Sequence, residues 1–347
     1  MEAIVSVQTV RKNMFARGVL FFLLMAGGFF AQVNSGAVFE RTQFFGKDFV
    51  RMTDWARSSN LELQWITKGR ELRATNANHR IYFSMDGRRI QVNGVNLLLS
   101  LPVLFQRGTA YISSVDAQMT LKPILFPEKS KEDNSVTTIC LDPGHGGKDP
   151  GKTDGKMQEK SCSLLLAADV EKLLKQAGLK VIRTRARDLF VDLPERTRLA
   201  NQRKADLFLS LHYNAAANRR VEGAEVFCLT PAGTASSEND DWKKASSPTY
   251  PGNSQNQGNI LLAYQMQKSL VKKLNVEDRG IKRAQFVVLL DGKMPSILIE
   301  GGFMTNPNDA KRIYDPAYRK RMAGAIVDGI LAYKKSVEKT VPTVSSN

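Results

Sequence analysis

The carboxyl-terminal part of the chain alternates short apolar runs with longer segments whose apolar residues recur every three or four positions. Short apolar runs bounded by turn residues predict strands, whereas the three-to-four spacing predicts helices. Their alternation predicts an α/β fold, with a mixed, mostly parallel sheet flanked by helices on both faces. The expected strands cover residues 136–141, 179–184, 206–211, 223–229, 286–290 and 296–299, and the expected helices cover 159–176, 193–204, 259–274 and 316–335. A polar segment at 230–258, rich in Ser, Asn, Gly and Pro, is expected to be a long loop.

The preceding segment has a different pattern. Residues 48–56 have the spacing of a short amphipathic helix, and alternating strands are expected at 61–65, 71–75, 79–84 and 89–92. Asn93-Gly94 is a hairpin signal, so the last of these strands should turn back into 95–99, and a strand and a helix should follow at 111–113 and 115–121. We therefore expect the following organisation: a small α+β binding or spacer domain at 36–128, a charged linker at 129–137, the α/β domain at 138–338 and a disordered tail at 339–347.

Residues 1–35 have the pattern of an export signal. Arg11, Lys12 and Arg17 precede an apolar run at 18–31, which is short for a membrane span but typical of a signal peptide. Retention of this segment as an uncleaved anchor is the alternative. No later segment is long and apolar enough to cross a bilayer, so we expect a protein of the periplasm or cell envelope with no membrane span after cleavage.

The net charge limits the classes of binding partner, and the cysteine content bears on disulfide bonds. The formal net charge of +16 favours attraction to something anionic, such as nucleic acid, acidic lipid or a cell-wall polymer. The basic residues are spread along the chain and no nucleic-acid motif accompanies them, so we expect no nucleic-acid partner. Three cysteines are too few, and odd in number, for a disulfide framework, and we interpret them as small buried apolar residues.

Four residues at the ends of apolar runs carry candidate chemistry. His145 and His212 each end an expected strand, Glu159 begins an expected helix, and Glu300 follows the last expected strand. Parallel strands would bring both histidines to one edge of the sheet. Two histidines and a glutamate suit Zn²⁺ with one coordination position left for water, and a further glutamate can act as a base. The two histidines and Glu159 also have an ordinary structural reading, because strand-end histidines and first-turn glutamates are common. Glu300 differs, because an acid at the end of such an apolar strand should either bind something or do chemistry.

One motif in the same region points elsewhere. Residues 146–153, Gly-Gly-Lys-Asp-Pro-Gly-Lys-Thr, fit the expression for a phosphate-binding P-loop. A phosphate cradle needs successive backbone N–H donors and a helix that starts at the Lys-Thr pair. Pro150 removes one donor, and Asp154-Gly155 follows where the helix should continue. We therefore reject a nucleotide-binding function.

Several blocks in order resemble the zinc-dependent N-acetylmuramoyl-L-alanine amidases, which cut bacterial peptidoglycan. The blocks are Asp142-Pro143-Gly144-His145-Gly146-Gly147, Glu159-Lys160, Thr184-Arg185, Leu193 with Arg196, Ala200-Asn201, Ser210-Leu211-His212-Tyr213-Asn214-Ala215, Asp278-Arg279-Gly280-Ile281-Lys282 and Glu300-Gly301-Gly302-Phe303-Met304-Thr305-Asn306. The resemblance covers about 138–334 and departs little from the family pattern, at Tyr213 and Thr305. Residues 89–125 of the amino-terminal region resemble, more loosely, the small stalk domain of copper amine oxidases.

The amidase resemblance implies zinc ligands at His145, Glu159 and His212 and a catalytic carboxylate at Glu300. It implies hydrolysis of the amide bond between N-acetylmuramic acid and L-alanine in peptidoglycan, in cell-wall remodelling or cell separation. A zinc peptidase acting on wall peptides and a non-catalytic peptidoglycan-binding protein are the alternatives.

Further expectations concern the surroundings of the site. We expect Asn214 and Arg283 to bind substrate, and an activator or envelope protein to contact the amino-terminal domain. Asp142 is a candidate for orienting a ligand imidazole, with a strand-end turn role as the alternative.

Overall fold

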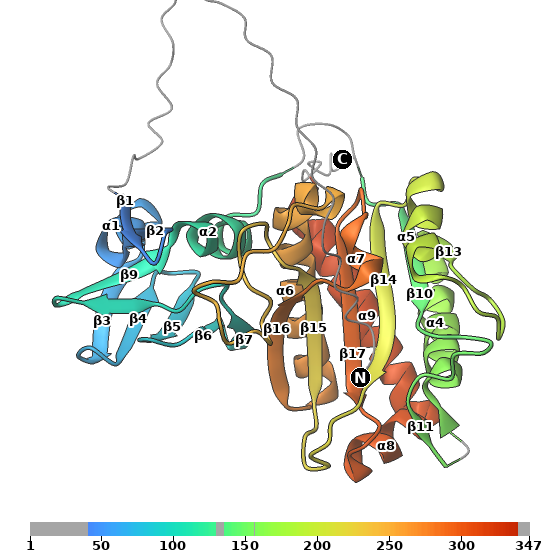
Figure 1. The fold of residues 1–347 in the computed structure, drawn as a ribbon. Helices are drawn as coiled ribbons and strands as arrows, with labels where there is room; N and C mark the ends of the chain where they lie inside the picture. Colours follow the sequence, from blue (N-terminus) through green and yellow to red (C-terminus); the bar gives the residue numbers. More distant parts are fainter. Residues whose placement is uncertain (1–40, 130–134, 156, 339–347) are drawn as a thin grey trace, which may run out of the picture. The chain divides into compact units, whose positions relative to one another are not determined.

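The computed structural model of the protein describes residues 41–129, 135–155 and 157–338 (Figure 1). These residues belong to one compact unit. The expected signal at 1–35 and the expected tail at 339–347 lie outside the described residues, as does most of the expected linker at 129–137. Within the described ranges, no helix combines the length and the apolar character that a membrane crossing needs.

An eleven-stranded sheet runs through the described residues, in the order β13-β10-β14-β17-β15-β16-β7-β6-β5-β4-β3. The strands β13, β10, β14 and β17 are parallel neighbours. Next to them, β15 runs antiparallel to β17 and parallel to β16. The carboxyl ends of β10, β14 and β17 therefore meet at one edge of the sheet. The bounds are β10 (Thr138–Pro143), β13 (Lys180–Arg183), β14 (Leu207–Asn214), β15 (Ala224–Leu229), β16 (Asp278–Ala284) and β17 (Ser296–Phe303).

Helices cover both faces of this half of the sheet. On one face α4 (Glu159–Gln176), α6 (Asn256–Leu274) and α9 (Pro316–Val337) pack together, and on the other lie α5 (Leu193–Gln202) and α7 (Val287–Leu290). Side chains of β14 alternate between the two layers, since Leu209 joins the core with α4, α6 and α9 whereas Phe208 packs with residues of α5 and α7. A strand buried on both faces needs such an apolar run. The expected α/β fold class is confirmed.

The amino-terminal region adds an antiparallel meander to the sheet. Its strands are β3 (Glu62–Thr67), β4 (Glu71–Thr75), β5 (Arg80–Ser84), β6 (Arg89–Val92) and β7 (Val95–Leu98). A second, four-stranded sheet has the order β1-β2-β9-β8. The remaining elements of the region are β1 (Arg41–Phe44), β2 (Lys47–Arg51), α1 (Met52–Ser58), β8 (Leu104–Gln106), β9 (Thr109–Ser113), α2 (Ser114–Asp116), η1 (Ala117–Leu121) and α3 (Lys122–Leu125).

The meander joins the α/β half through β7 and β16, which pair in parallel at Leu97 and Ile281. The side-chain carboxylate of Asp278 accepts a hydrogen bond from the backbone N–H of Asn96 at 2.7 Å. The backbone carbonyl of Asp278 accepts a second one from Asn96 Nδ2 at 3.1 Å. The backbones approach closely, because a Cβ at Gly280 would lie 2.9 Å from the Asn96 carbonyl oxygen. The sheet therefore crosses the expected domain boundary, and the separate folding of residues 36–128 stays a prediction.

The expected helix at 48–56 is wrong in its first half. Phe49 and Val50 lie in β2, opposite Ser113 and Ile112 of β9, and the helix begins only at Met52. Phe49 and Val50 are consecutive and both buried, so this run lacks the alternation of apolar and polar residues that would predict a strand. A short apolar run of this kind fits a strand and a helix equally well.

The expected strand at 286–290 is also wrong, because its apolar run forms the short helix α7. The expected loop at 230–258 ends early, at η2 (Pro251–Gln255) and the start of α6. Sequence patterns missed β16, whose residues are mostly charged or small, and the helix α8 (Pro307–Tyr314). The expectation for the cysteines is confirmed, since Cys140, Cys162 and Cys228 are free and buried.

Candidate metal centre

The carboxyl ends of β10 and β14 bring His145 and His212 together, with ring centroids 4.9 Å apart. Glu159, the first residue of α4, lies between them. Its Oε2 is 3.0 Å from Nε2 of His145, and its Oε1 is 2.9 Å from Nδ1 of His212. The three ligand atoms all lie within 4.8 Å of one another, the one such group of His, Cys, Asp or Glu found in the described ranges.

Two buried arginines hold the turn that presents His145. Arg196 donates hydrogen bonds to the carbonyl oxygens of Pro143 at 3.0 Å and of His145 at 2.9 Å. Arg185 donates to the carbonyl of Gly144 at 2.7 Å. These bonds fix a turn in which His145 itself has φ of +61°, an uncommon conformation for a residue with a side chain. The two arginines therefore position the histidine through the backbone.

Two glycines in the same turn leave room for the ligand side chains. A Cβ at Gly144 would lie 2.2 Å from Cε1 of His212. A Cβ at Gly151, where φ is +65°, would lie 2.6 Å from both Oε2 of Glu159 and Cδ2 of His145. The glycine-rich turn that resembles a P-loop thus packs against the candidate ligands. In place of the helix that a P-loop requires, Thr153–Asp154 forms the short strand β11.

Glu159 is buried, and both oxygens of its carboxylate make polar contacts. Besides the two imidazoles it accepts hydrogen bonds from the backbone N–H groups of Lys152 at 2.9 Å and Tyr213 at 3.1 Å. Burial alone would raise the pKa of Glu159, but the hydrogen bonds from His145 and His212 outweigh it and hold the pKa well below its usual range. The carboxylate is therefore ionised and ready to bind a cation.

Asp149 orients His145 from the far side of the ring. Its Oδ2 lies 2.8 Å from Nδ1 of His145, which leaves Nε2 directed at Glu159. A carboxylate on the second ring nitrogen is a common partner of a metal-binding histidine. Asp142 was also a candidate for this role, with a strand-end turn role as the alternative, and its hydrogen bonds fit the structural alternative. The Asp142 carboxylate is buried and accepts hydrogen bonds from three other side chains, those of Thr184, Arg196 and Ser210.

Glu300 lies in β17 directly opposite His212 of β14. Its Oε2 is buried and has no hydrogen-bond partner among the described residues. Burial raises the pKa of this carboxyl well above its usual range, and the negative charges of Glu159 and Glu225 add to the shift, while Lys282 opposes it. The strand continues to Phe303, so Glu300 lies within β17 and not at its end.

The residues fit a zinc ion. Two imidazoles and one carboxylate with converging donor atoms are the ligand set of catalytic zinc sites that keep one position for water. Beside this ligand set, the buried Oε2 of Glu300 has no hydrogen-bond partner among the described residues, which suits a carboxylate that contacts a water molecule or the substrate rather than the ion.

The two expected substrate-binding residues lie apart. Asn214 follows His212 by two residues, and its Nδ2 donates to Glu225 Oε1 at 2.7 Å, close to Glu300. Arg283 is buried toward the other end of β16, where it donates to the carbonyls of Leu229 and Met119 at 3.2 Å each. The structure thus brings Asn214 to the candidate site and leaves Arg283 in a packing contact between the two regions.

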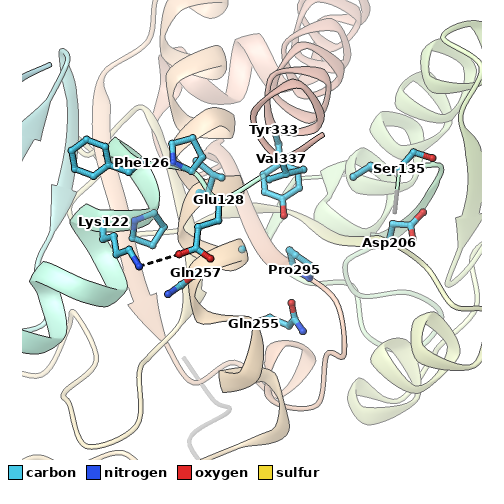
Figure 2. A pocket seen from close by; sticks show the side chains of 15 residues that line it. Lys122, Phe126, Glu128, Ser135, Asp206, Gln255, Gln257, Pro295, Tyr333 and Val337 are labelled. Carbon is cyan, nitrogen blue, oxygen red and sulfur yellow. Dashed lines mark hydrogen bonds and ion pairs between the residues drawn. The ribbon is translucent and has the colours of Figure 1, made fainter. Parts of the chain in front are cut away.

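A pocket of about 380 Å³ lies away from this centre (Figure 2). Asp206 and Pro295, which precede β14 and β17, line it, so it lies at the opposite end of those strands from His212 and Glu300. The Lys122 side chain donates to Glu128 Oε1 at 3.0 Å at its rim. None of the candidate ligands contributes to this pocket.

Sequence reasoning missed two acids near the centre, Asp149 and Glu225. The spacing of four residues between His145 and Asp149 is a signal for the first, since both lie in the same turn. Glu225 had no such signal, because its place opposite Glu300 depends on the pairing of β15 with β17.

The α/β part of the chain is similar to known proteins of one family. Residues 139–332 match the family model described as N-acetylmuramoyl-L-alanine amidase. The chain is 35% identical over 196 residues to N-acetylmuramoyl-L-alanine amidase LytC of Bacillus subtilis, covering 56% of this chain and 35% of that protein. It is 30% identical over 227 residues to N-acetylmuramoyl-L-alanine amidase AmiA of Escherichia coli, covering 59% of this chain and 78% of that protein. Among solved structures, AmiC2 of Nostoc punctiforme matches with 31% identity and a TM-score of 0.49, covering 58% of this chain and 98% of that one.

The chain belongs to the N-acetylmuramoyl-L-alanine amidase family. It is an enzyme of the class that hydrolyses an amide bond of peptidoglycan. The match begins at residue 139, so the amino-terminal region lies outside it, and the likeness of that region to the copper amine oxidase stalk domain stays a prediction.

Proposed function

We propose that this enzyme uses zinc to hydrolyse the amide bond between N-acetylmuramic acid and L-alanine, in cell-wall remodelling or cell separation. The observation that carries the proposal is the convergence of His145, Glu159 and His212 within 4.8 Å, beside the buried carboxyl of Glu300. Membership of the family supports the reaction class, and the ligand set of two histidines and one glutamate supports zinc as the metal.

His145, Glu159 and His212 would hold the zinc ion. When bound, zinc supplies a Lewis acid that polarises the scissile carbonyl and lowers the pKa of water from about 15.7 toward about 7. Glu300 is the base: an ionised Oε2 takes a proton from the attacking water and then delivers it to the amide nitrogen as the peptide leaves. The proton that leaves water thus ends on the new amino group, and the carboxylate is regenerated.

The surrounding residues have positioning roles in this proposal. Asp149 holds the His145 ring by its Nδ1, and Arg196 holds the backbone carbonyl of the same residue. Asn214 remains the candidate for contacting substrate, because it lies beside Glu225 and two residues from His212. Arg283 is not part of the proposed site, because its guanidinium is buried against backbone carbonyls.

The proposal includes export to the periplasm or cell envelope. Arg11, Lys12 and Arg17 before the apolar run at 18–31 support it. Sequencing the amino terminus of the mature protein should find a start between about residues 32 and 39. An intact Met1 on soluble cytoplasmic protein would contradict export. An activator or envelope protein that contacts the amino-terminal region is also proposed, on the ground that this region lies outside the matched catalytic segment.

Mass spectrometry of the products released from purified sacculi tests the reaction. An amidase leaves intact wall peptides with a free amino group on L-alanine and glycan strands without peptide. A wall peptidase leaves shortened peptides that are still attached to N-acetylmuramic acid. Detection of shortened attached peptides alone would replace the proposed reaction with the peptidase alternative.

A further inference from the structure

A row of paired residues crosses nine strands of the large sheet, from the candidate metal centre to the outermost strand of the meander. The strands that carry it, from β14 to β3, are labelled in Figure 1. The printed pairs are His212–Glu300, Glu300–Glu225, Glu225–Gly280, Asn96–Gln91, Gln91–Tyr82, Tyr82–Arg73 and Arg73–Gln64. Gly280 and Asn96 are neighbours at the junction, because the residues that follow them, Ile281 and Leu97, pair directly. Paired residues project from the same face of a sheet. The polar side chains of the meander row therefore share a face with Glu300.

The other face of the meander is apolar and covered. The residues that alternate with the row, such as Leu72, Ile81, Phe83 and Ile90, are buried in the main core. The row itself is polar and accessible, since Gln64 is exposed and Arg73, Tyr82 and Gln91 are partly exposed. The division of the strands into an apolar face and a wet face follows from their period of two.

The wet face is hollowed beside the row. A hollow of about 690 Å³ lies over β4, β5 and β6. Its lining includes Arg73, Thr75, Arg80, Tyr82, Gln91 and Asn93. Arg73 donates to Gln64 through Nη2, while its Nε is buried and has no hydrogen-bond partner among the described residues. The hollow thus presents two guanidinium groups, planar amides, the phenol ring of Tyr82 and the imidazole of His79.

These groups suit one kind of ligand. A guanidinium binds carboxylates with two parallel hydrogen bonds, and planar amides bond to hydroxyl and acetamido groups. An aromatic ring offers an apolar surface with a polar tip, against which the apolar face of a sugar can pack. A chain of acetamido sugars that carries peptides with free carboxylates has all of these partners.

Two cationic side chains, both paired with Glu225, lie between the hollow and Glu300. Lys282 and Arg279 lie on β16, between the meander and β17, and both contact Glu225, with Nζ at 2.7 Å and Nε at 3.1 Å from its Oε2. Both side chains keep some exposure, 16% for Lys282 and 25% for Arg279. Tyr82 lies five strands from Glu300, which corresponds to about 24 Å at ~4.8 Å per strand. Only an extended polymer can occupy the metal centre and the hollow together.

We propose that the wet face of the meander, defined by Gln64, Arg73, Arg80, Tyr82 and Gln91, is a second binding site for peptidoglycan, which holds the strand while one of its amide bonds is at the metal centre. The inference rests on the proposed function, because it takes the substrate polymer as the ligand. It assigns a role to a region that the family match does not include.

Sedimentation of the zinc-loaded full-length protein with purified sacculi tests this site. Glu300→Gln is the parent, so that the polymer stays intact during the measurement. Arg73→Ser and Tyr82→Ala in this parent should each weaken binding by about tenfold, the worth of one good contact. Arg80→Ser, at an exposed position on the rim of the hollow, should weaken binding in the same direction without affecting folding.

Arg57→Ser is the matched control, because it removes the same charge from a side chain that is 82% exposed on α1. It should bind like the parent. Equal loss in Arg57→Ser and Arg73→Ser would overturn the inference, since the net charge alone would then hold the polymer. Binding by all three hollow variants that equals the parent would overturn it as well. Peptide release by the wild-type enzyme is measured separately, so a failure of the proposed function is distinguished from a failure of the second site.

Discussion

Glu225 lies directly opposite Glu300 across the antiparallel pair of β15 and β17, so two acids are neighbours in the centre of the sheet. Glu225 is 1% exposed and is neutralised by Lys282 and Arg279, whose nitrogens lie 2.7 Å and 3.1 Å from its Oε2. Glu300 has no such partner for its Oε2 among the residues described. Of these two neighbouring acids, Glu225 is held in ion pairs, whereas burial raises the pKa of Glu300.

The first prediction follows from this pair. Glu300 must be ionised to accept a proton, so kcat/KM should fall as the pH drops through its pKa. Burial raises the pKa of Glu300, and the charge of Glu225 raises it further. Glu225→Gln removes that charge, lowers the pKa and should move the acid limb of the pH profile to lower pH. Glu277→Gln is the control, because Glu277 is 59% exposed and lies 3.9 Å from Arg279. An acid limb that stays in place, or that moves to higher pH, would contradict the assignment of Glu300 as the base.

The second prediction concerns Asp149. Asp149→Asn keeps the shape of the side chain but removes the charge that faces Nδ1 of His145 at 2.8 Å. Loss of such a partner costs about 10–100-fold in metal affinity. Zinc affinity measured by competition with a chelator should fall by this amount. Asp154→Asn, at an exposed position bonded to Tyr314, should leave the affinity unchanged. Equal affinities in the two variants would show that Asp149 does not support the metal.

The third prediction uses two glycines with similar backbone conformations. Gly151 has φ of +65° and Gly155 has φ of +56°, so alanine strains the backbone at either position. A Cβ at Gly151 would lie 2.6 Å from Glu159 Oε2, whereas a Cβ at Gly155 meets nothing within 4 Å. Gly155→Ala should lose about 1 kcal/mol of stability from backbone strain, and Gly151→Ala should lose more because its Cβ also clashes. Only Gly151→Ala should also lose zinc, as elemental analysis will measure. Full zinc in Gly151→Ala would mean that this turn does not shape the site.

Much of the fold and of the metal centre could be predicted from the sequence because both depend on local patterns. The periodicity of α4 gave its limits, and its first residue, Glu159, is a candidate ligand. His145 and His212 follow apolar runs, and parallel pairing of β10 with β14 then brings them to one edge. The positions of these two histidines could be predicted from the ends and the directions of the strands alone.

Other features depend on pairings that no local pattern encodes. The strand β16 contains Arg279, Lys282 and Arg283 and lacks an apolar run, so it was missed, and with it the junction to β7. Glu225 and Glu300 are neighbours because β15 pairs with β17 in the antiparallel direction, next to strands that are parallel. The continuous row from the metal centre to the meander is visible only once these pairings are known.

The most direct test of the account is Glu300→Gln, assayed for zinc content and for release of free peptide from purified sacculi. Glu300 lies beside the three ligands without being one of them, so the variant should fold and retain one zinc per chain. Without the base, peptide release should fall by roughly 10²–10⁴-fold. His145→Ala is the companion variant and should lose zinc and peptide release together. A Glu300→Gln enzyme that holds its zinc and releases peptide at the wild-type rate would contradict the account, because Glu300 would then not be the base.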